Sequence, residues 1–165
     1  MKINKNFLVD NFVSLFYAIV IAIIIRSLIF QPFFIPSSSM EPTLLVGDRI
    51  FVSKYSYGYS KHSFPFSPPI FDKRIFSSTP NRGDVIVFKT PSDNRTDYIK
   101  RLVGLPGDNI QFIDGDLFIN SNQVFKTLKS STDIIFCGNK SFPVNTFQEL
   151  MPNGKKHVSV YSKKY

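Results

Sequence analysis

Residues 7–30 read FLVDNFVSLFYAIVIAIIIRSLIF, an apolar block of 24 residues that fixes the first element of the fold. As a helix rising about 1.5 Å per residue, this block exceeds the roughly 30 Å hydrocarbon core of a bilayer. Its charged side chains, Asp10 and Arg26, lie near opposite ends, where they can reach the membrane interfaces. Pro32 restricts the residue before it and should end the helix. We therefore predict a transmembrane helix anchor over residues 7–30.

Two other interpretations of the apolar block compete with the anchor. A buried core helix is disfavoured because the rest of the chain offers little apolar surface to cover it. A cleaved secretory signal is the stronger rival, because Ser37-Ser38-Ser39 resembles a small-residue cleavage site. Cleavage after Ser39 would remove the apolar block and leave a secreted β protein. The length of the block and the position of Arg26 favour a permanent anchor. Lys2 and Lys5 then indicate that residues 1–6 form a cytoplasmic tail, with the main domain outside the cytoplasm.

Beyond the anchor, the sequence shows the short apolar runs that are typical of β-strands. Residues 48–53 and 84–88 form two such runs, each preceded by a glycine. Residues 110–113 and 117–119 form two more, and the Asp114-Gly115 dipeptide between them is a strong hairpin signal. No stretch here has helical periodicity. We predict a mainly β, antiparallel and barrel-like domain over residues 33–165, with a surface loop rich in Pro, Ser and Phe at residues 55–80.

The composition excludes several kinds of site. A single cysteine, Cys137, allows neither an intramolecular disulfide nor a cysteine-based metal site. His62 and His157 lie far apart, in no spacing typical of a metal site or a Ser-His-Asp triad, and we expect ordinary loop or surface histidines. The net charge is +8, and the Lys and Arg residues are scattered, without a basic helix interleaved with aromatics. We therefore expect the basic side chains to face the anionic surface of the lipid bilayer and not a nucleic acid. Any serine chemistry here must use a base other than histidine.

Two segments carry the candidate chemistry: residues 36–44, PSSSMEPTL, and residues 97–108, DYIKRLVGLPGD. Taken alone, a run of three serines is usually a turn, and Lys-Arg after a short apolar stretch is usually a solvated strand end. Their occurrence together, directly after a membrane anchor, is what favours a functional interpretation.

Together these features resemble the bacterial type I signal peptidase (leader peptidase) family, which uses a serine–lysine dyad. The resemblance spans the anchor through about Val124, and residues 82–88 look like the family's intervening strand. The family signature Ser-x-Ser-Met-x-Pro-Thr is matched at Ser37, Ser39, Met40, Pro42 and Thr43. The signature Lys-Arg-x-x-Gly-x-Pro-Gly-Asp is matched at Lys100, Arg101, Gly104, Pro106, Gly107 and Asp108.

The resemblance implies a site and a reaction. Ser39 would attack the scissile carbonyl, Lys100 would take its proton as general base, and the Ser39 backbone N–H with the Ser37 hydroxyl would form the oxyanion site. The substrate would be a signal-peptide-bearing precursor, cleaved after small residues of the Ala-x-Ala type without metal or cofactor. It would bind as an added strand between residues 33–36 and 97–99. The resemblance places these substrate-binding positions at Phe33, Ile35, Pro36, Met40, Tyr98 and Ile99.

The same resemblance implies a single-pass protein of the bacterial inner membrane with its catalytic domain on the extracytoplasmic side. A further family motif, a Gly-Asp-Asn-Arg-type stretch that supports the lysine, is not found, and residues 137–140, CGNK, come nearest to it. We therefore expect a C-terminally truncated member. The alternative function is an inactive, membrane-tethered β domain that binds extended peptides without cleaving them.

Overall fold

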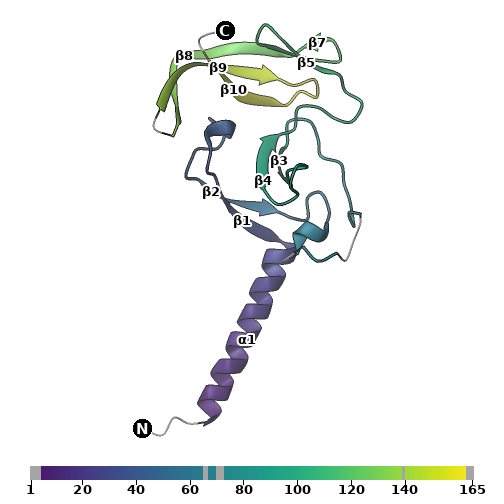
Figure 1. Cartoon of the computed structure of the whole chain (residues 1–165), viewed down its shortest axis with the longest axis vertical. Helices are drawn as coiled ribbons and strands as arrows, with labels where there is room; N and C mark the ends of the chain where they lie inside the picture. Colours follow the sequence, from purple (N-terminus) through teal and green to yellow (C-terminus); the bar gives the residue numbers. More distant parts are fainter. Residues whose placement is uncertain (1–4, 65–66, 70–72, 139, 163–165) are drawn as a thin grey trace. The chain divides into compact units, whose positions relative to one another are not determined.

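The computed structural model describes residues 5–64, 67–69, 73–138 and 140–162. Parts of the expected tail (residues 1–4), loop (65–66 and 70–72) and C-terminal segment (163–165) lie outside these ranges. Within them the chain has one long N-terminal helix followed by short antiparallel sheets (Figure 1), which confirms the predicted mainly β fold class.

The chain divides into two compact units. The first comprises Met1–Phe33 and Phe51–Thr79, and the second comprises Phe34–Ile50 and Pro80–Tyr165. Strands β1 (Phe30–Phe34) and β2 (Arg49–Ser53) form a two-stranded sheet, and the division between the units falls within these two strands.

The first unit contains helix α1 (Lys5–Leu28). Its Val9–Leu28 span has a mean hydropathy of 2.0, and within the described ranges it is the one helix long and apolar enough to cross a membrane. The end of the helix is tied to the segment after β2. The Tyr59 hydroxyl donates to the Leu28 carbonyl at 2.9 Å, and the Lys54 N–H donates to the Ile29 carbonyl at 3.0 Å.

Between residues 55 and 80, the described part of the chain holds the short 3-10 helix η2 (Lys61–Ser63) and a single antiparallel bridge between Tyr59 and Ile75. Backbone carbonyls of Tyr57 and Gly58 accept hydrogen bonds from Arg74, at 3.3 and 3.2 Å. Side-chain and bridge contacts thus organise this segment in place of a continuous sheet.

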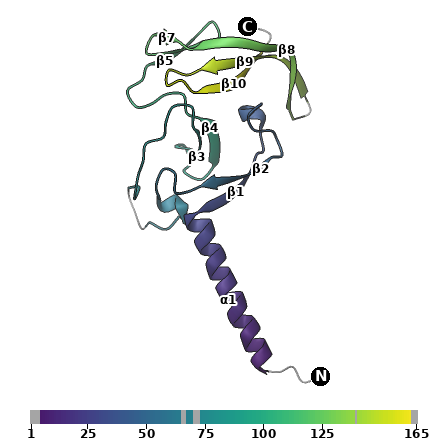
Figure 2. The ribbon, with the colours of Figure 1, turned by 180° about the vertical axis from the view of Figure 1, so that it is seen from behind.

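The second unit begins with the 3-10 helix η1 (Ser38–Met40) and the antiparallel pair β3 (Val85–Lys89) and β4 (Asp97–Arg101), which Figure 2 shows from behind. Strands β5 (Ile110–Ile113), β6 (Asp116–Ile119) and β7 (Asn122–Gln123) follow. The predicted hairpin is confirmed: Ile113 pairs with Asp116 across the Asp114-Gly115 turn. Both turn residues have positive φ, 49° and 81°, as a type I′ turn requires.

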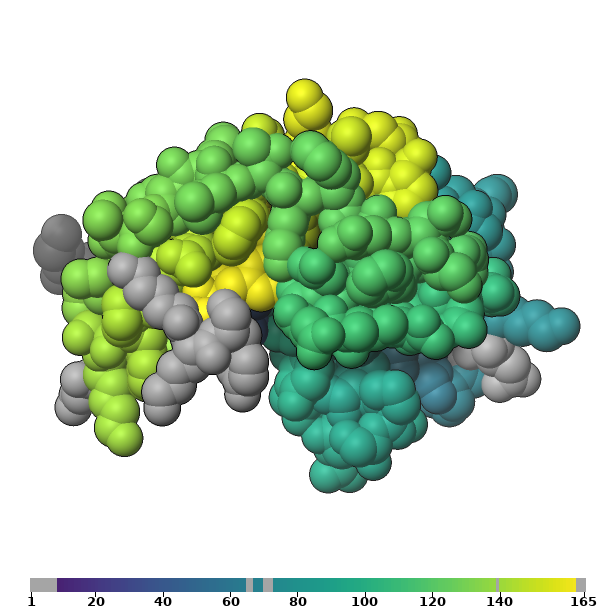
Figure 3. All heavy atoms as spheres, turned by 90° about the horizontal axis from the view of Figure 1, so that it is seen from above, coloured from purple at the N-terminus to yellow at the C-terminus, as the bar shows by residue number. Residues whose placement is uncertain are grey.

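A third sheet of this unit consists of β8 (Phe125–Cys137), β9 (Lys140–Leu150) and β10 (Lys156–Ser162), in the order β10-β9-β8. It packs beside the β5–β7 hairpins, as the green and the lime-to-yellow atoms of Figure 3 show. Lys126 of β8 donates to the Gly115 carbonyl, and the Phe112 and Tyr161 rings lie 6.4 Å apart. Four buried side chains form the core beneath: Leu117, Ile119, Val124 and Met151.

The prediction that His157 is an ordinary loop or surface histidine is wrong, because it lies in strand β10. Its side chain is only 10% exposed, and its Nε2 lies 3.1 Å from a carboxylate oxygen of Glu149. The register explains the contact, because His157 and Glu149 are direct partners across β10 and β9 and therefore share one face of the sheet. The Tyr161 hydroxyl donates to the other oxygen of the same carboxylate.

Candidate active site

The segment that carries the predicted nucleophile is fixed by backbone bonds on both sides of Ile35. The Ile35 N–H donates to the Asp48 carbonyl, and the Ile35 carbonyl accepts from Gly47, both at 2.9 Å. Gly47 has a φ of +99°, a conformation that glycine adopts without steric cost. Ile35 is 2% exposed and Met40 is 7% exposed. Between these two buried side chains, Ser39 is exposed and Ser38 is half-buried.

The predicted base is presented by a regular strand. Lys100 lies in β4 opposite Ile86 of β3, and its side chain is half-buried. Tyr98, two residues earlier, projects from the same face of the strand. The Lys100 ammonium lies 5.7 Å from the centroid of the Tyr98 ring.

These two segments meet at Ser39 and Lys100. Lys100 Nζ donates a hydrogen bond to Ser39 Oγ at 2.5 Å. The Ser37 hydroxyl lies 3.4 Å from the same Ser39 oxygen. A serine hydroxyl within hydrogen-bond reach of an amine is the arrangement that nucleophilic catalysis requires. The predicted serine, its predicted base and the predicted side-chain donor for the oxyanion thus lie together within one unit.

Arg101, next to the base, holds the chain just beyond the nucleophile. Its guanidinium donates to the Gly83 carbonyl at 2.9 Å and to the Thr43 hydroxyl at 3.0 Å. Partial burial lowers the pKa of Arg101 from its ordinary value. Strand β4 therefore contacts the nucleophile segment through two successive side chains.

The end of the second motif has a structural role. Asp108 pairs with Arg82 at 2.8 Å, and both side chains are about nine-tenths buried. Hydrogen bonds from the Leu105 N–H and the Asn120 amide lower the pKa of Asp108, and the guanidinium acts in the same direction. Asp108 thereby closes the turn after β4 and joins it to the hairpin turn at Asn120.

The residues predicted to bind substrate lie along two backbone segments. Within the second unit, Pro36 and Tyr98 are exposed, Ile99 is half-buried, and Ile35 and Met40 are buried. Phe33 belongs to the first unit. Among the described strands, β4 pairs only with β3, so its other edge carries unpaired backbone groups beside Lys100. An unpaired edge of this kind can accept an extended peptide as an additional strand.

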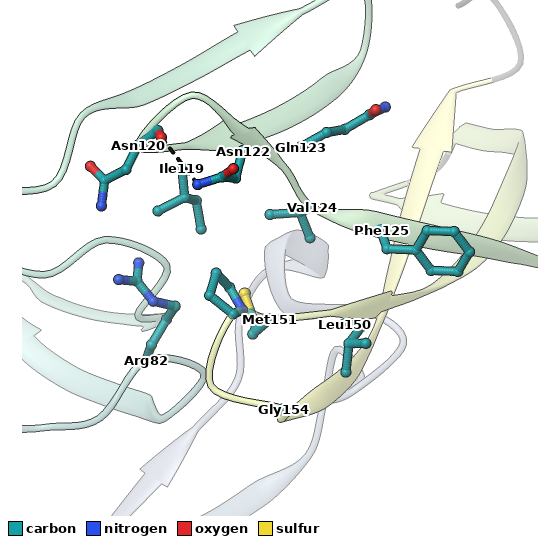
Figure 4. Close-up of a pocket in the computed structure, with 11 residues that line it drawn as sticks. Arg82, Ile119, Asn120, Asn122, Gln123, Val124, Phe125, Leu150, Met151 and Gly154 are labelled. Carbon is teal, nitrogen blue, oxygen red and sulfur yellow. Dashed lines mark hydrogen bonds between the residues drawn. The ribbon is translucent and has the colours of Figure 1, made fainter.

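A separate cavity of about 430 Å³ opens elsewhere in the same unit (Figure 4). Ile119, Val124 and Met151 of the core line it, with the Asn120, Asn122 and Gln123 amides around them. Neither Ser39 nor Lys100 belongs to its lining, so the cavity is distinct from the serine–lysine pair. Within the described ranges, no group of three or more His, Cys, Asp or Glu side chains could hold a metal ion.

Sequence reasoning missed two contacts of the nucleophile segment. One is the Arg101–Thr43 hydrogen bond, although both residues lie in the matched motifs. The other joins Ser38 Oγ and Cys137 Sγ at 2.9 Å, across 99 positions of sequence. Neither motif spacing nor strand periodicity carries a signal for a contact of that separation.

Comparison with known proteins shows which chains this sequence resembles. The model of the family described as signal peptidase, peptidase S26, matches residues 8–159. Signal peptidase I of Rickettsia typhi (strain ATCC VR-144 / Wilmington) is 42% identical over 160 residues, which cover 96% of this chain and 59% of the relative. For the protein of the same name from Rickettsia canadensis (strain McKiel) the identity is 45% over 148 residues, 88% of this chain and 54% of the relative. The chain thus spans less than two thirds of the length of these curated relatives.

Proposed function

Because the chain belongs to the signal peptidase, peptidase S26, family, we propose that it is a membrane-anchored serine endopeptidase that removes signal peptides from secreted precursor proteins. Ser39 is the nucleophile in this proposal, and Lys100 is the general base. The observation that carries it is the 2.5 Å hydrogen bond between Lys100 Nζ and Ser39 Oγ, which joins two motifs 61 positions apart.

The reaction follows from the chemistry of these two groups. Lys100 as a neutral amine takes the proton of the Ser39 hydroxyl while Ser39 Oγ attacks the scissile carbonyl carbon. The resulting ammonium then protonates the leaving amine, which releases the mature protein and leaves the signal peptide as an ester on Ser39. A water molecule, deprotonated by the same amine, hydrolyses the ester and restores the free serine.

Charge on the carbonyl oxygen has to be stabilised in both steps. The Ser39 backbone N–H and the Ser37 hydroxyl are the proposed donors, and the 3.4 Å separation of the two serine hydroxyls supports the role of Ser37. Removing one donor of this kind typically costs about 3–4 kcal/mol of transition-state stabilisation. We therefore expect Ser37→Ala to lower the cleavage rate by about 10²-fold or more.

The open edge of β4 supports binding of the precursor as an extended strand along Tyr98 and Ile99, with Ile35 and Pro36 on its other side. We propose that the precursor is cleaved after small side chains, as in Ala-x-Ala sites. The apolar helix α1 supports single-pass anchoring in a membrane. In this proposal the membrane is the bacterial inner membrane, and Lys2 and Lys5 favour a cytoplasmic N-terminus with the catalytic part on the extracytoplasmic side. Precursors are anchored by their own apolar signal segments, so an anchored enzyme meets their cleavage sites close to the bilayer.

The proposal is tested with the purified full chain in detergent and a precursor that carries an Ala-x-Ala site. We expect the wild-type chain to cleave once, after the second Ala, and to be unaffected by EDTA. Ser39→Ala and Lys100→Ala should each lower the rate by about 10³-fold or more. The matched controls Ser131→Ala and Lys129→Ala, on the exposed surface of β8, should retain full activity.

Equal cleavage by wild type and both dyad variants would refute the assignment of nucleophile and base. A wild-type chain that binds the precursor without cutting it would favour the alternative of a membrane-tethered, peptide-binding β domain. If only one of the two variants loses activity, the chain is still a peptidase. The residue whose replacement abolishes cleavage must then act with a partner other than the second member of the dyad.

A further inference from the structure

The 3-10 helix that carries Ser39 is held from a second direction, by the end of β8. Helix η1 contacts both β4 and β8. On the β4 side the contact is the hydrogen bond between Lys100 and Ser39. On the β8 side it is the 2.9 Å contact between Ser38 Oγ and Cys137 Sγ. Cys137 is the last residue of β8, where it pairs with Lys140 of β9.

The turn that carries Ser39 is short. Helix η1 is a single turn, and such turns have poorer hydrogen-bond geometry than an α-helix. The Glu41 N–H donates back to the Ser38 carbonyl at 3.0 Å, and Met40 is buried, but Ser37 and Ser39 are exposed. A side-chain contact made by the residue between them therefore restrains the rotation of the turn, and with it the direction of both hydroxyls.

Small errors in the direction of a nucleophile are costly, because a catalytic group must be held within about 0.5 Å of its productive position. Ser38 has no place in the proposed reaction, and its side chain instead reaches an element 99 positions away. A thiol donates and accepts only weak hydrogen bonds, and the Ser38 hydroxyl is the partner that the structure gives the Cys137 thiol.

We propose that Ser38 and Cys137 are positioning residues, which together hold η1 so that Ser39 faces Lys100. The inference rests on the proposed function, since it assigns these residues to the same reaction. It makes a serine peptidase sensitive to thiol reagents: a group added to the Cys137 sulfur would push Ser38 and its turn away from Lys100.

The geometry is tested without any activity measurement, with a Ser38→Cys variant of the full chain in detergent. Mild oxidation with diamide should convert the two thiols, at positions 38 and 137, into an intramolecular disulfide, while the diamide takes up the two hydrogen atoms. Mass spectrometry of peptides should show that cross-link. The matched control Ser131→Cys places its thiol in the same strand as Cys137 but six positions away, and should give none. Absence of the cross-link in Ser38→Cys would overturn the proposed contact.

The effect on catalysis is tested with two substitutions of one residue. Cys137→Ala should lower kcat about tenfold and leave KM unchanged, whereas Cys137→Ser, which keeps a hydrogen-bonding group, should stay within twofold of wild type. N-ethylmaleimide should inactivate the wild-type chain but not Cys137→Ser. Equal kcat for wild type and Cys137→Ala, or maleimide inhibition that persists in Cys137→Ser, would overturn the positioning role.

The two proposals fail in different ways. If Ser39→Ala cleaves as fast as wild type, the proposed function is wrong, whatever the cross-linking shows. If Ser39→Ala is inactive but Ser38→Cys does not form the disulfide, the dyad stands and the positioning inference falls.

Discussion

Lys100 and Arg101 are neighbours in β4, and their side chains hold two different points of one segment. Lys100 contacts Ser39, and Arg101 contacts Thr43, four positions further along. Alternation along a strand directs successive side chains to opposite faces, so the two contacts restrain the segment from two sides. In this Lys-Arg pair, Lys100 thus contacts the proposed nucleophile, and Arg101 restrains the segment that carries it.

Replacing Arg101 by lysine should weaken this restraint, because a lysine ammonium cannot reproduce the planar fork that reaches Thr43 and the Gly83 carbonyl together. Hydrogen bonds made by charged donors contribute about 1.5–3 kcal/mol each, and partial exposure reduces that figure. We expect Arg101→Lys to lower the free energy of unfolding by about 1–2 kcal/mol and to slow cleavage. Denaturant titration in detergent measures the first effect, with exposed Arg95→Lys as the control, and equal stability of the two variants would contradict the prediction.

Glu149 couples the stability of the β8–β10 sheet to pH. Burial alone would raise the pKa of this carboxyl, but hydrogen bonds from His157 and Tyr161 outweigh burial and lower the pKa to about 2. A carboxylate whose pKa is lower in the folded state stabilises that state above the unfolded value of 4.5. The stabilisation is lost as the pH falls from about 4.5 towards 2.

We therefore expect the wild-type chain to lose about 1–2 kcal/mol of stability in this acid range from Glu149, a figure discounted for solvent screening. Glu149→Gln has no titrating carboxyl and should show a flatter dependence of stability on pH across the same window. Unfolding free energies of both chains at several pH values measure the difference. Parallel curves would show that Glu149 contributes nothing to the acid transition.

At the scale of elements, the hairpin turn between β5 and β6 depends on one glycine. Gly115 has a φ of +81°, and a Cβ added there would meet no atom within 4 Å, so only backbone strain opposes a side chain. Gly115→Ala should therefore cost about 1 kcal/mol of stability, while Gly115→Asn, which tolerates positive φ better, should cost less. Thermal unfolding measures the stability of the two variants. A Gly115→Asn variant less stable than Gly115→Ala would refute the type I′ turn.

The elements that sequence could predict are those with a local signal. Strands β2 and β3 have apolar runs that follow glycines, and the β5–β6 hairpin has an Asp-Gly turn. The β8–β10 sheet has no such signal, because Lys, Ser, Thr and Asp fill much of β8 and a proline, Pro143, lies in β9. Long-range register and the cluster around Glu149 stabilise that sheet, and neither is visible in periodicity. For the same reason the Ser38–Cys137 contact was not predicted, whereas Ser39 and Lys100 were predicted from a resemblance to known motifs.

Helix α1 has an apolar surface that the rest of the described chain leaves uncovered. Only 6% of its membrane-length window is buried, and side chains such as Phe12 and Phe16 are 75% and 60% exposed. A helix that is apolar all round and unburied needs a nonpolar environment, and lipid supplies one. The side of the membrane on which the β-rich part lies is then the remaining question, and a chemical label can answer it.

The single cysteine makes that experiment direct, because Cys137 is exposed and the sequence holds no other thiol. If the β-rich part lies outside the cytoplasm, a membrane-impermeant maleimide added to intact spheroplasts should label the wild-type chain. Cys137→Ser should stay unlabelled. An Ile3→Cys change in that background should react only after lysis, because the lysines beside position 3 favour a cytoplasmic N-terminus. Labelling of the wild type only after lysis would place the β-rich part in the cytoplasm, where it could not meet exported precursors, and would remove the basis for a role in signal-peptide cleavage.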